Sequence, residues 1–343
     1  MKRIKLMVLL IFVGGFFVGI ASTFGLRAGL NYFATTELER SFSETAQFTN
    51  PYLECPGFSG VDTKLNQARA EIIDFVEAKE ANDDSLQVSV YARDLKNGPW
   101  IGVNESQRYV SASLMKVPVM MMLLKQIEEG RLSPNDMLEY QPENLDPNRD
   151  INSEAVEAVA TMIPGESYSV LDLMTFMTAY SSNEAFFTLL DVTDIDDRNT
   201  FEKAVGVDWS ALNYPQMVSV KNYSGFFRVL YNASYLNRDT SEFALNLLSQ
   251  TRFDFGLKAG VPEGTVVANK YGNQEQYQEG DRVIESRNDL TLSRKTKFLH
   301  DCGIVYHPES PYALCVMTSS AEKSNIALSE IIAEISSIVY RYR

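Results

Sequence analysis

The chain has 343 residues, of which 45% are apolar and 11% aromatic, and it carries a net charge of −14. This composition is sufficient for a large hydrophobic core, so it excludes an intrinsically disordered chain. The acidic balance also argues against a nucleic-acid partner, because phosphate backbones are bound by basic patches and none is visible in this sequence.

The first segment predicts how the protein is localised. A basic start is followed by residues 6–26, which contain no charged side chain. A helix of this length, at 1.5 Å per residue, crosses the roughly 30 Å hydrocarbon core of a bilayer. We therefore expect residues 1–28 to be a membrane anchor, or alternatively a signal peptide cleaved near Ala21. Because basic residues stay inside, the rest of the chain is expected outside the cytoplasm, either held at the cell membrane or secreted.

The next segments predict a linker and the start of a folded domain. Residues 29–60 show no sustained hydrophobic period and are interrupted by prolines, as linkers are. Apolar residues at helical spacing then predict a helix over 61–81. Alternating apolar and polar residues predict a half-buried strand over 86–95, and residues 100–105 return as its hairpin partner.

The run "VSASLMKVPVMMMLLKQIEEG", Val110 to Gly130, predicts a helix that is buried on every side. Pro118 lacks an amide hydrogen and is tolerated only near the first turn, so Ser113 and Lys116 should lie at or just before the helix start. A lysine there opposes the helix dipole, and burial disfavours its charge. Residues three apart on a helical turn are neighbours, so a neutral Lys116 amine can accept the proton of Ser113.

The remaining elements predict one α+β domain. Helical patterns cover residues 170–190 and 222–236, and a last helix covers 327–343. Strand patterns precede that last helix at 265–272, 300–308 and 311–320. This order predicts a domain over residues 61–343 in which an antiparallel sheet is built from both termini and packs against a helical subdomain.

The cysteines and histidines point to no metal centre, and no cofactor is expected. Cys55, Cys302 and Cys315 are too few for a disulfide scaffold and too scattered for a zinc site. The last two fall on predicted strands joined by a short turn, so a bridge between them and two buried free thiols both remain open. His300 and Asp301 are adjacent on a strand and therefore point to opposite faces, which argues against a Ser-His-Asp triad.

Three short motifs follow one another in the chain. The first is Ser113-x-x-Lys116, the second is Ser181-Ser182-Asn183 between two helical segments, and the third is Lys270-Tyr271-Gly272 at the end of a predicted strand. A further S-x-x-K begins at Ser320, but no motif follows it. In their order and context the three resemble the S-x-x-K, S-x-N and K-[ST]-G motifs of the penicillin-recognising serine hydrolases, which include the class A β-lactamases.

The resemblance covers roughly residues 61–343 and implies a β-lactamase/transpeptidase-like fold. It implies that Ser113 is the acylated nucleophile and Lys116 its base. Ser181 would relay protons to the leaving nitrogen, Asn183 would bind the substrate's side-chain amide, and Lys270 would supply positive charge near the substrate carboxylate.

The resemblance also implies roles for backbone groups at the first and third motifs. Gly272 would let the strand edge approach the ligand closely, and the backbone amides of Ser113 and Asn273 would form the oxyanion hole. Tyr271 departs from the family, which has Ser or Thr at this substrate-binding position, because a phenol is too long to sit where a small hydroxyl would hold the ligand carboxylate.

A second departure from the family concerns deacylation, the step in which water releases the acyl group from the serine. Class A β-lactamases carry an E-x-x-L-N segment whose glutamate activates water, and the nearest match here is "DWSALN", with Trp209 at the glutamate position. Asp208, one residue early, is the candidate deacylation base.

We therefore expect a membrane-tethered serine hydrolase that hydrolyses β-lactams or related amides through Ser113. The alternatives are a penicillin-binding-protein-like D,D-peptidase acting on peptidoglycan stem peptides, and a non-catalytic cell-wall binding module. A pure binder has no need to keep all five polar residues of the three motifs. The expected partner is thus a β-lactam or a peptidoglycan-like small substrate.

Overall fold

The structure is a computed structural model that describes residues 47–49, 63–96, 98–142, 162–193, 195–205, 217–279, 282–284 and 294–343. All of them belong to one compact unit, Glu44–Arg343. The predicted anchor, most of the predicted linker, Cys55 and Asp208 lie outside the described residues. Among the helices that the structure describes, none has the length and apolar character needed to cross a membrane.

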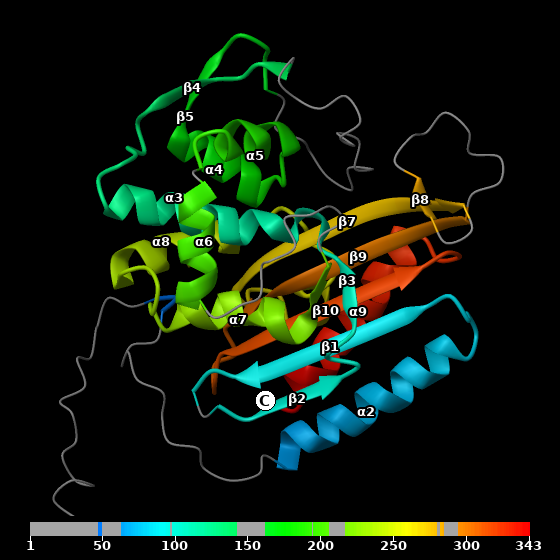
Figure 1. Ribbon diagram of the computed structural model, residues 1–343. Helices are drawn as coiled ribbons and strands as arrows, with labels where there is room; N and C mark the ends of the chain where they lie inside the picture. Colours follow the sequence, from blue (N-terminus) through cyan, green and yellow to red (C-terminus); the bar gives the residue numbers. More distant parts are fainter. Residues whose placement is uncertain are drawn as a thin grey trace, which may run out of the picture. The chain divides into compact units, whose positions relative to one another are not determined.

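A six-stranded antiparallel sheet runs through this unit in the order β2-β1-β10-β9-β7-β8 (Figure 1). Its strands are β1 (Gln87–Asp94), β2 (Trp100–Val103), β7 (Val267–Glu279), β8 (Arg282–Ile284), β9 (Arg294–Val305) and β10 (Tyr312–Ser320). Strands from the start and the end of the domain thus pair directly, which confirms the predicted sheet built from both termini.

Helices pack on both faces of the sheet. Those of the described part are α2 (Thr63–Glu80), α3 (Lys116–Glu128), α4 (Val170–Ala179), α5 (Asn183–Leu190), α6 (Ile195–Val205), α7 (Val220–Tyr231), α8 (Arg238–Ser249) and α9 (Asn325–Arg341). Helices α2 and α9 cover one face, whereas the others form a helical half on the opposite side (Figure 1). Two small sheets complete the unit: β3 (Arg108–Val110) with β6 (Met217–Ser219), and β4 (Met137–Glu139) with β5 (Ser167–Ser169).

The two cores follow from the alternation of side chains along the strands. Tyr91 and Cys315 belong to the core shared with the helical half, whereas their neighbours Val90 and Val316 belong to the core under α2 and α9. Every residue of β10 is buried, because this strand lies inside the sheet and both of its faces are covered. The helical half therefore meets the sheet across one continuous apolar layer.

Strands β7 and β9 extend beyond the segments that their sequence pattern predicts. The predicted strands covered 265–272 and 300–308, but β7 continues to Glu279 and β9 begins at Arg294. The added stretches are rich in polar residues and pair with each other over Asn273–Gln278. Hydrophobic alternation does not reveal such strands, because backbone pairing rather than side-chain burial holds them.

A short segment of the predicted linker packs into the domain. The amides of Gln47, Phe48 and Thr49 donate to the carboxylate of Glu242 on α8, at 2.5, 2.5 and 2.8 Å. Phe48 is buried in the core, and its carbonyl accepts a 2.9 Å hydrogen bond from the hydroxyl of Tyr306, which follows β9. Residues 47–49 thus form a strap that contacts both the helical half and the sheet.

The structure resolves the two alternatives for the paired cysteines. Cys302 on β9 and Cys315 on β10 lie directly opposite each other and form a disulfide. The same row of the sheet continues to Lys270 on β7 and to Tyr91 on β1. Residues in one row share a face, so the disulfide lies beside Lys270 on the side of the helical half.

Replacing both cysteines, in Cys302→Ala/Cys315→Ala, should lower the free energy of unfolding by about 2–4 kcal/mol, because the bridge closes a loop with a sequence separation of 13 in the unfolded chain. Urea unfolding in non-reducing buffer measures this loss. Alkylation of the denatured, unreduced wild-type chain should label Cys55 alone. Labelling of all three cysteines, or a double variant as stable as the wild type, would contradict the bridge.

Candidate active site

Ser113 lies on a tight turn between β3 and α3. Residues Ala112–Met115 form a 3-10 turn, and α3 begins at Lys116 with Pro118 in its first turn, as the sequence predicts. Ala112 has a positive φ of 48°, an uncommon conformation for a residue with a side chain. The hydroxyl of Tyr223 on α7 donates to the carbonyl of Leu114 at 2.8 Å and so fixes the turn. The half-buried Ser113 is thereby presented at the start of a buried helix.

Lys116 is surrounded by oxygen atoms of the first two motifs. Its Nζ lies 2.9 Å from Ser113 Oγ, 2.5 Å from the carbonyl oxygen of Ser181 and 2.7 Å from Asn183 Oδ1. The carbonyl and amide oxygens can only accept, so they take two N–H bonds of the amine. In the neutral amine this leaves a lone pair that can accept from a hydroxyl, and the hydroxyl of Ser113, at 2.9 Å, is nearer than that of Ser181, at 3.2 Å.

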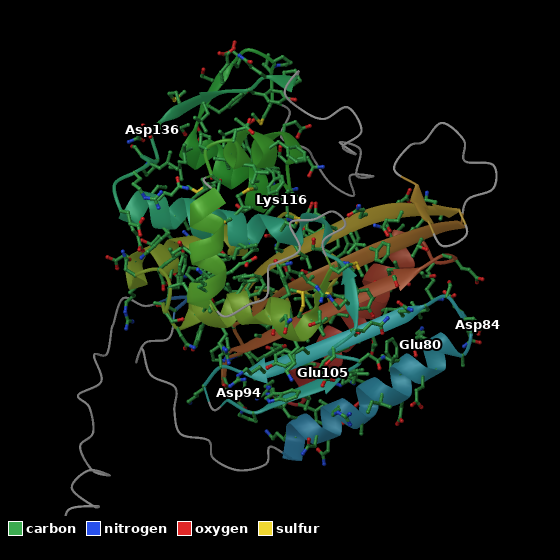
Figure 2. All side chains as sticks on the ribbon, in the orientation of Figure 1. Glu80, Asp84, Asp94, Glu105, Lys116 and Asp136 are labelled. Atoms are coloured by element: carbon green, nitrogen blue, oxygen red, sulfur yellow. A yellow bond between two sulfur atoms is a disulfide. The ribbon has the colours of Figure 1, made fainter. Side chains whose placement is uncertain are left out.

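Burial and a neighbouring charge favour this neutral form. Lys116 is only 2% exposed. Its pKa is lowered well below the ordinary value, first by burial and second by the positive charge of Lys270, while Glu184 acts weakly in the opposite direction. Figure 2 shows Lys116 where the helical half meets the sheet. Little water reaches the amine at this place, which explains why burial is the largest cause of the lowered pKa of Lys116.

Ser181 connects the two buried lysines. It lies between α4 and α5 with a positive φ of 56°, and the following Ser182 caps α5 by accepting a hydrogen bond from the amide of Ala185. The Ser181 Oγ is 3.2 Å from the Nζ of Lys116 and 2.8 Å from that of Lys270. A hydroxyl in contact with both a neutral amine and a cation can accept a hydrogen bond from the cation and donate its own hydrogen to the neutral amine.

Lys270 is fully buried on β7. Besides Ser181 Oγ, its Nζ donates to the carbonyl of Tyr271 at 2.9 Å. Burial lowers the pKa of Lys270 to about 7, and Asp301 raises it in part. The lysine therefore stands near its midpoint at neutral pH and carries a positive charge below it.

Gly272 allows β7 to approach the turn of Ser113. A Cβ atom at this position would lie 3.2 Å from the backbone nitrogens of Ser113 and Leu114 and from the carbonyl of Ser111. The close approach that the structure shows is to the turn that carries Ser113, and the approach to a ligand that the resemblance implies stays a prediction. Asn273 follows directly on the same strand, so its backbone lies near the turn that carries Ser113.

The Tyr271 side chain is partly buried and packs against the core under α2 and α9, while the Nζ of Lys270 lies 4.3 Å from the centroid of its ring. Its ring stacks on that of Phe253, with centroids 4.2 Å apart and an angle of 12° between the planes. The phenol thus joins the core under α2 and α9 and does not replace the small hydroxyl of the family motif. The assignment of Tyr271 to substrate binding and the expectation that the carboxylate site differs here stay predictions.

The competing sequence patterns have structural explanations. Ser320 of the second S-x-x-K donates to Asp83 at 2.8 Å, and Lys323 pairs with the same carboxylate at 3.6 Å. His300 lies against the backbone of Val110, whereas Asp301 accepts from the amide of Leu257. These contacts lie on different sides of β9, so the two side chains do not form a relay to a serine.

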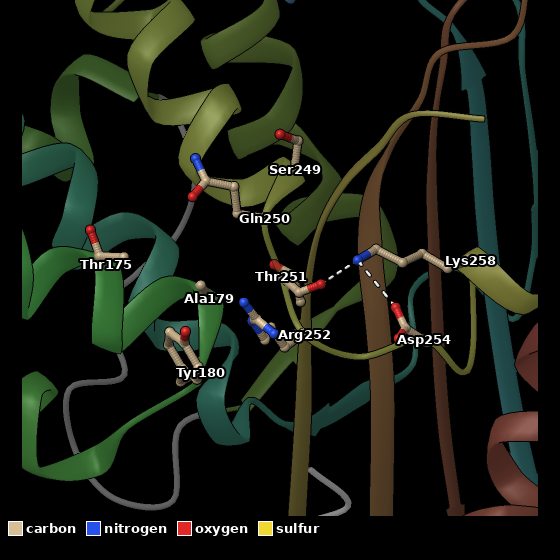
Figure 3. Close-up of a pocket in the computed structure, with 9 residues that line it drawn as sticks. All are labelled: Thr175, Ala179, Tyr180, Ser249, Gln250, Thr251, Arg252, Asp254 and Lys258. Carbon is tan, nitrogen blue, oxygen red and sulfur yellow. Dashed lines mark hydrogen bonds and ion pairs between the residues drawn. The ribbon is translucent and has the colours of Figure 1, made fainter. Parts of the chain in front are cut away.

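An open pocket of about 640 Å³, which no sequence pattern predicted, lies beside the second motif (Figure 3). Its wall includes Tyr180, which precedes Ser181, and Arg252, whose guanidinium lies 5.3 Å from the Tyr180 ring. The amide of Arg252 donates to the carbonyl of Ala179 at 2.8 Å. No motif marks these residues, because backbone contacts between α4 and the loop after α8 bring them together. Within the described part of the chain, no three His, Cys, Asp or Glu side chains gather as metal ligands would.

Solved structures with a similar fold are β-lactamases and a penicillin-binding protein. The structure of PBP-A matches with a TM-score of 0.65 and 20% identity, over 84% of this chain and 98% of that one. A β-lactamase from Chitinophaga pinensis matches with a TM-score of 0.62 and 20% identity, over 80% and 99%. One from Sphaerobacter thermophilus gives 0.64 and 16%, over 80% and 96%. These likenesses establish the β-lactamase and penicillin-binding-protein fold.

No curated protein matches this sequence. The model of the family described as "Beta-lactamase enzyme family" matches residues 67–343, which is most of the chain and contains all three motifs. The domain that carries Ser113, Lys116 and Lys270 is therefore the part that the family shares. On this match and on the fold, the chain belongs to the β-lactamase enzyme family.

Proposed function

We propose that this protein is an active-site-serine hydrolase in which β-lactams or related amides acylate Ser113. One observation carries the proposal: the buried amine of Lys116 lies 2.9 Å from Ser113 Oγ while acceptor-only oxygens occupy two of its hydrogens. An amine held in this way accepts the hydroxyl proton as the serine attacks. A module that merely bound cell wall would gain nothing from this arrangement.

The first step is acyl transfer to the serine. Lys116 takes the proton of Ser113, and Oγ forms a bond with the carbonyl carbon of the substrate. The backbone amides of Ser113 and Asn273 are the proposed donors to the oxyanion, where the loss of one donor typically costs about 3 kcal/mol. As the C–N bond breaks, Ser181 passes its proton to the leaving nitrogen and takes the proton held by Lys116 in return, so that Lys116 is neutral again and the ester of Ser113 remains.

The other residues of the site bind the substrate in this proposal. Lys270 supplies positive charge for a substrate carboxylate, and Asn183 contacts a side-chain amide of the substrate while its Oδ1 holds Lys116. PBP-A, one of the similar structures, is known as an acyl-enzyme complex of a variant with penicillin G. The same acylation chemistry supports the proposal for Ser113.

A D,D-peptidase-like activity on peptidoglycan stem peptides is the second candidate. One observation favours it: Trp209 stands where the class A motif has the glutamate that activates water. Both candidates begin with the same acyl-enzyme and differ only in how fast water releases it.

A fluorescent penicillin should label the protein, and peptide mapping should find the adduct on Ser113. Ser113→Ala should abolish labelling, because it removes the hydroxyl whose proton Lys116 accepts in the proposed mechanism. Ser320→Ala is the matched control from the second S-x-x-K and should be labelled like the wild type. An adduct on Ser111 or Ser320, or none at any concentration, would overturn the proposed function.

Lys116→Arg should reduce the acylation rate by more than about 100-fold, because a guanidinium stays protonated in proteins and cannot act as the base. The wild-type rate should rise with pH through a pKa well below that of an ordinary lysine, since burial and Lys270 disfavour the charge on Lys116. The pH dependence of penicillin labelling measures both effects. Lys323→Arg should behave like the wild type, whereas full activity in Lys116→Arg would place the base elsewhere.

Penicillin should give one rapid stoichiometric burst and then a slow steady state. The reason is Trp209, because positioned bases typically contribute 10²–10⁴-fold to such hydrolyses and the expected glutamate is absent at that position. Stopped-flow absorbance and intact mass over time follow the burst and the release. Asp208→Asn should leave the slow phase unchanged. A fast steady state that disappears in Asp208→Asn would instead identify Asp208 as the base.

A further inference from the structure

The aromatic residue of the third motif contacts the buried cation next to it. The Nζ of Lys270 lies over the ring of Tyr271, 4.3 Å from its centroid, and also donates to the Tyr271 carbonyl. The Ser or Thr that the family motif carries at this position has no ring and offers no such contact. Tyr271 therefore gives the Lys270 ammonium a partner that the three-motif pattern does not contain.

The Tyr271 ring is held firmly in this place. It stacks on Phe253, which is 1% exposed, and the loop that carries Phe253 is fixed by Asp301. That carboxylate accepts hydrogen bonds from the amide of Leu257 at 2.9 Å and from Asn269 Nδ2 at 2.8 Å. Asp301 also pairs with Tyr271 across the sheet. The Tyr271 ring, the loop that carries Phe253 and strand β9 thus pack together, and this packing fixes the position of the ring.

Charged groups from several elements act on this pair of lysines. Lys116 on α3 shares the Ser181 hydroxyl with Lys270, so two positive charges there would repel each other. Asp301 on β9 favours a charge on Lys270, and Lys258 acts on Asp301 in turn. Glu184 on α5 favours a charge on Lys116. A charge on Lys270 therefore disfavours a charge on Lys116, so a contact that stabilises the Lys270 ammonium also favours a neutral Lys116.

We propose that Tyr271 is a positioning residue whose ring keeps the single positive charge of the pair on Lys270 and so leaves Lys116 neutral. An aromatic face attracts a cation electrostatically, and more strongly where water is excluded, whereas it gains little from a neutral amine. Once Lys270 is charged, repulsion disfavours a proton on Lys116. This role rests on the proposed acylation of Ser113, which needs a neutral Lys116 and a cationic Lys270.

Replacing the ring by an aliphatic side chain of similar bulk tests the proposal. In Tyr271→Leu the pKa of Lys270 should fall by about 0.5 to 1.5, because the charged form loses its ring contact. The full chain labelled with ¹³C-lysine reports this pKa by NMR, and the resonance is assigned by its loss in Lys270→Met. The basic limb of the pH profile for penicillin acylation should move to lower pH by the same amount. Tyr271→Phe retains the ring, so the pKa of Lys270 and the basic limb of the pH profile should both stay as in the wild type.

Two further proteins separate the charge effect from packing. Trifluorophenylalanine at position 271 keeps the shape and the stacking but weakens the electrostatic attraction of the ring face, so its Lys270 pKa should lie between those of the Phe and Leu variants. Trp100→Leu removes a comparable contact elsewhere, where Lys221 Nζ lies 4.7 Å from the Trp100 ring, and should change neither readout. Trp100 is partly exposed at the sheet edge and takes no part in the site.

An unchanged Lys270 pKa in Tyr271→Leu would overturn the proposal. A trifluorophenylalanine protein whose Lys270 pKa equals that of Tyr271→Phe would also overturn it. A Phe variant that falls as far as the Leu variant would also overturn it, because the hydroxyl rather than the ring would then be responsible. The NMR titration does not depend on acylation. A wild type that no penicillin labels would refute the proposed function alone, and an unchanged pKa in a protein that is labelled at Ser113 would refute the role of Tyr271 alone.

Discussion

Two lysine amines on opposite sides of one serine hydroxyl are the constraint on which this site depends. Lys116 and Lys270 both lie within 3.2 Å of Ser181 Oγ, and both are almost completely removed from solvent. Two ammonium groups at this separation would repel each other without the screening that water provides. A positive charge on Lys270 therefore lowers the pKa of Lys116 and favours the neutral form of that amine.

The fold creates this pair by bringing together three parts of the chain that are distant in sequence. Lys116 comes from the start of α3, Ser181 from the loop between α4 and α5, and Lys270 from β7. Two of the local conformations are unfavourable in themselves, because Ala112 and Ser181 both adopt positive φ. Such conformations persist only where the surroundings hold them. Here a hydrogen bond from Tyr223 to the backbone of Leu114 fixes one turn, and Lys116, through the carbonyl of Ser181, fixes the other.

Much of this arrangement can be predicted from local sequence features, and the rest depends on contacts that no local pattern encodes. The position of Pro118 and the apolar run after it place Ser113 and Lys116 at a buried helix start. The spacing of Ser181 and Asn183 does not show that the backbone oxygen of one and the amide oxygen of the other both accept a hydrogen bond from Lys116. That result requires the left-handed turn at Ser181, which serine does not signal. The stack of Tyr271 on Phe253 joins a strand to a distant loop, so the sequence indicated only that the family residue was missing.

Strands β7 and β9 also show what local sequence patterns do not predict. Apolar alternation identifies the part of β7 that faces the two cores, including Val267 and Ala268. Beyond Gly272 the strand continues through polar residues, because β9 supplies the backbone partners. The short strands of the two small sheets have only three residues each, which is too few for any period to appear.

The strap formed by residues 47–49 bears on how the two halves of the domain are connected. The amines of Lys116 and Lys270 belong to different halves, so the repulsion that lowers the pKa of Lys116 depends on how these halves are held together. Phe48 and its neighbours contact Glu242 on α8 and Tyr306 beside the sheet, so they connect the two halves at a point outside the reacting groups. A segment that resembles a simple tether in the sequence therefore joins the part of the domain that carries Lys116 to the part that carries Lys270.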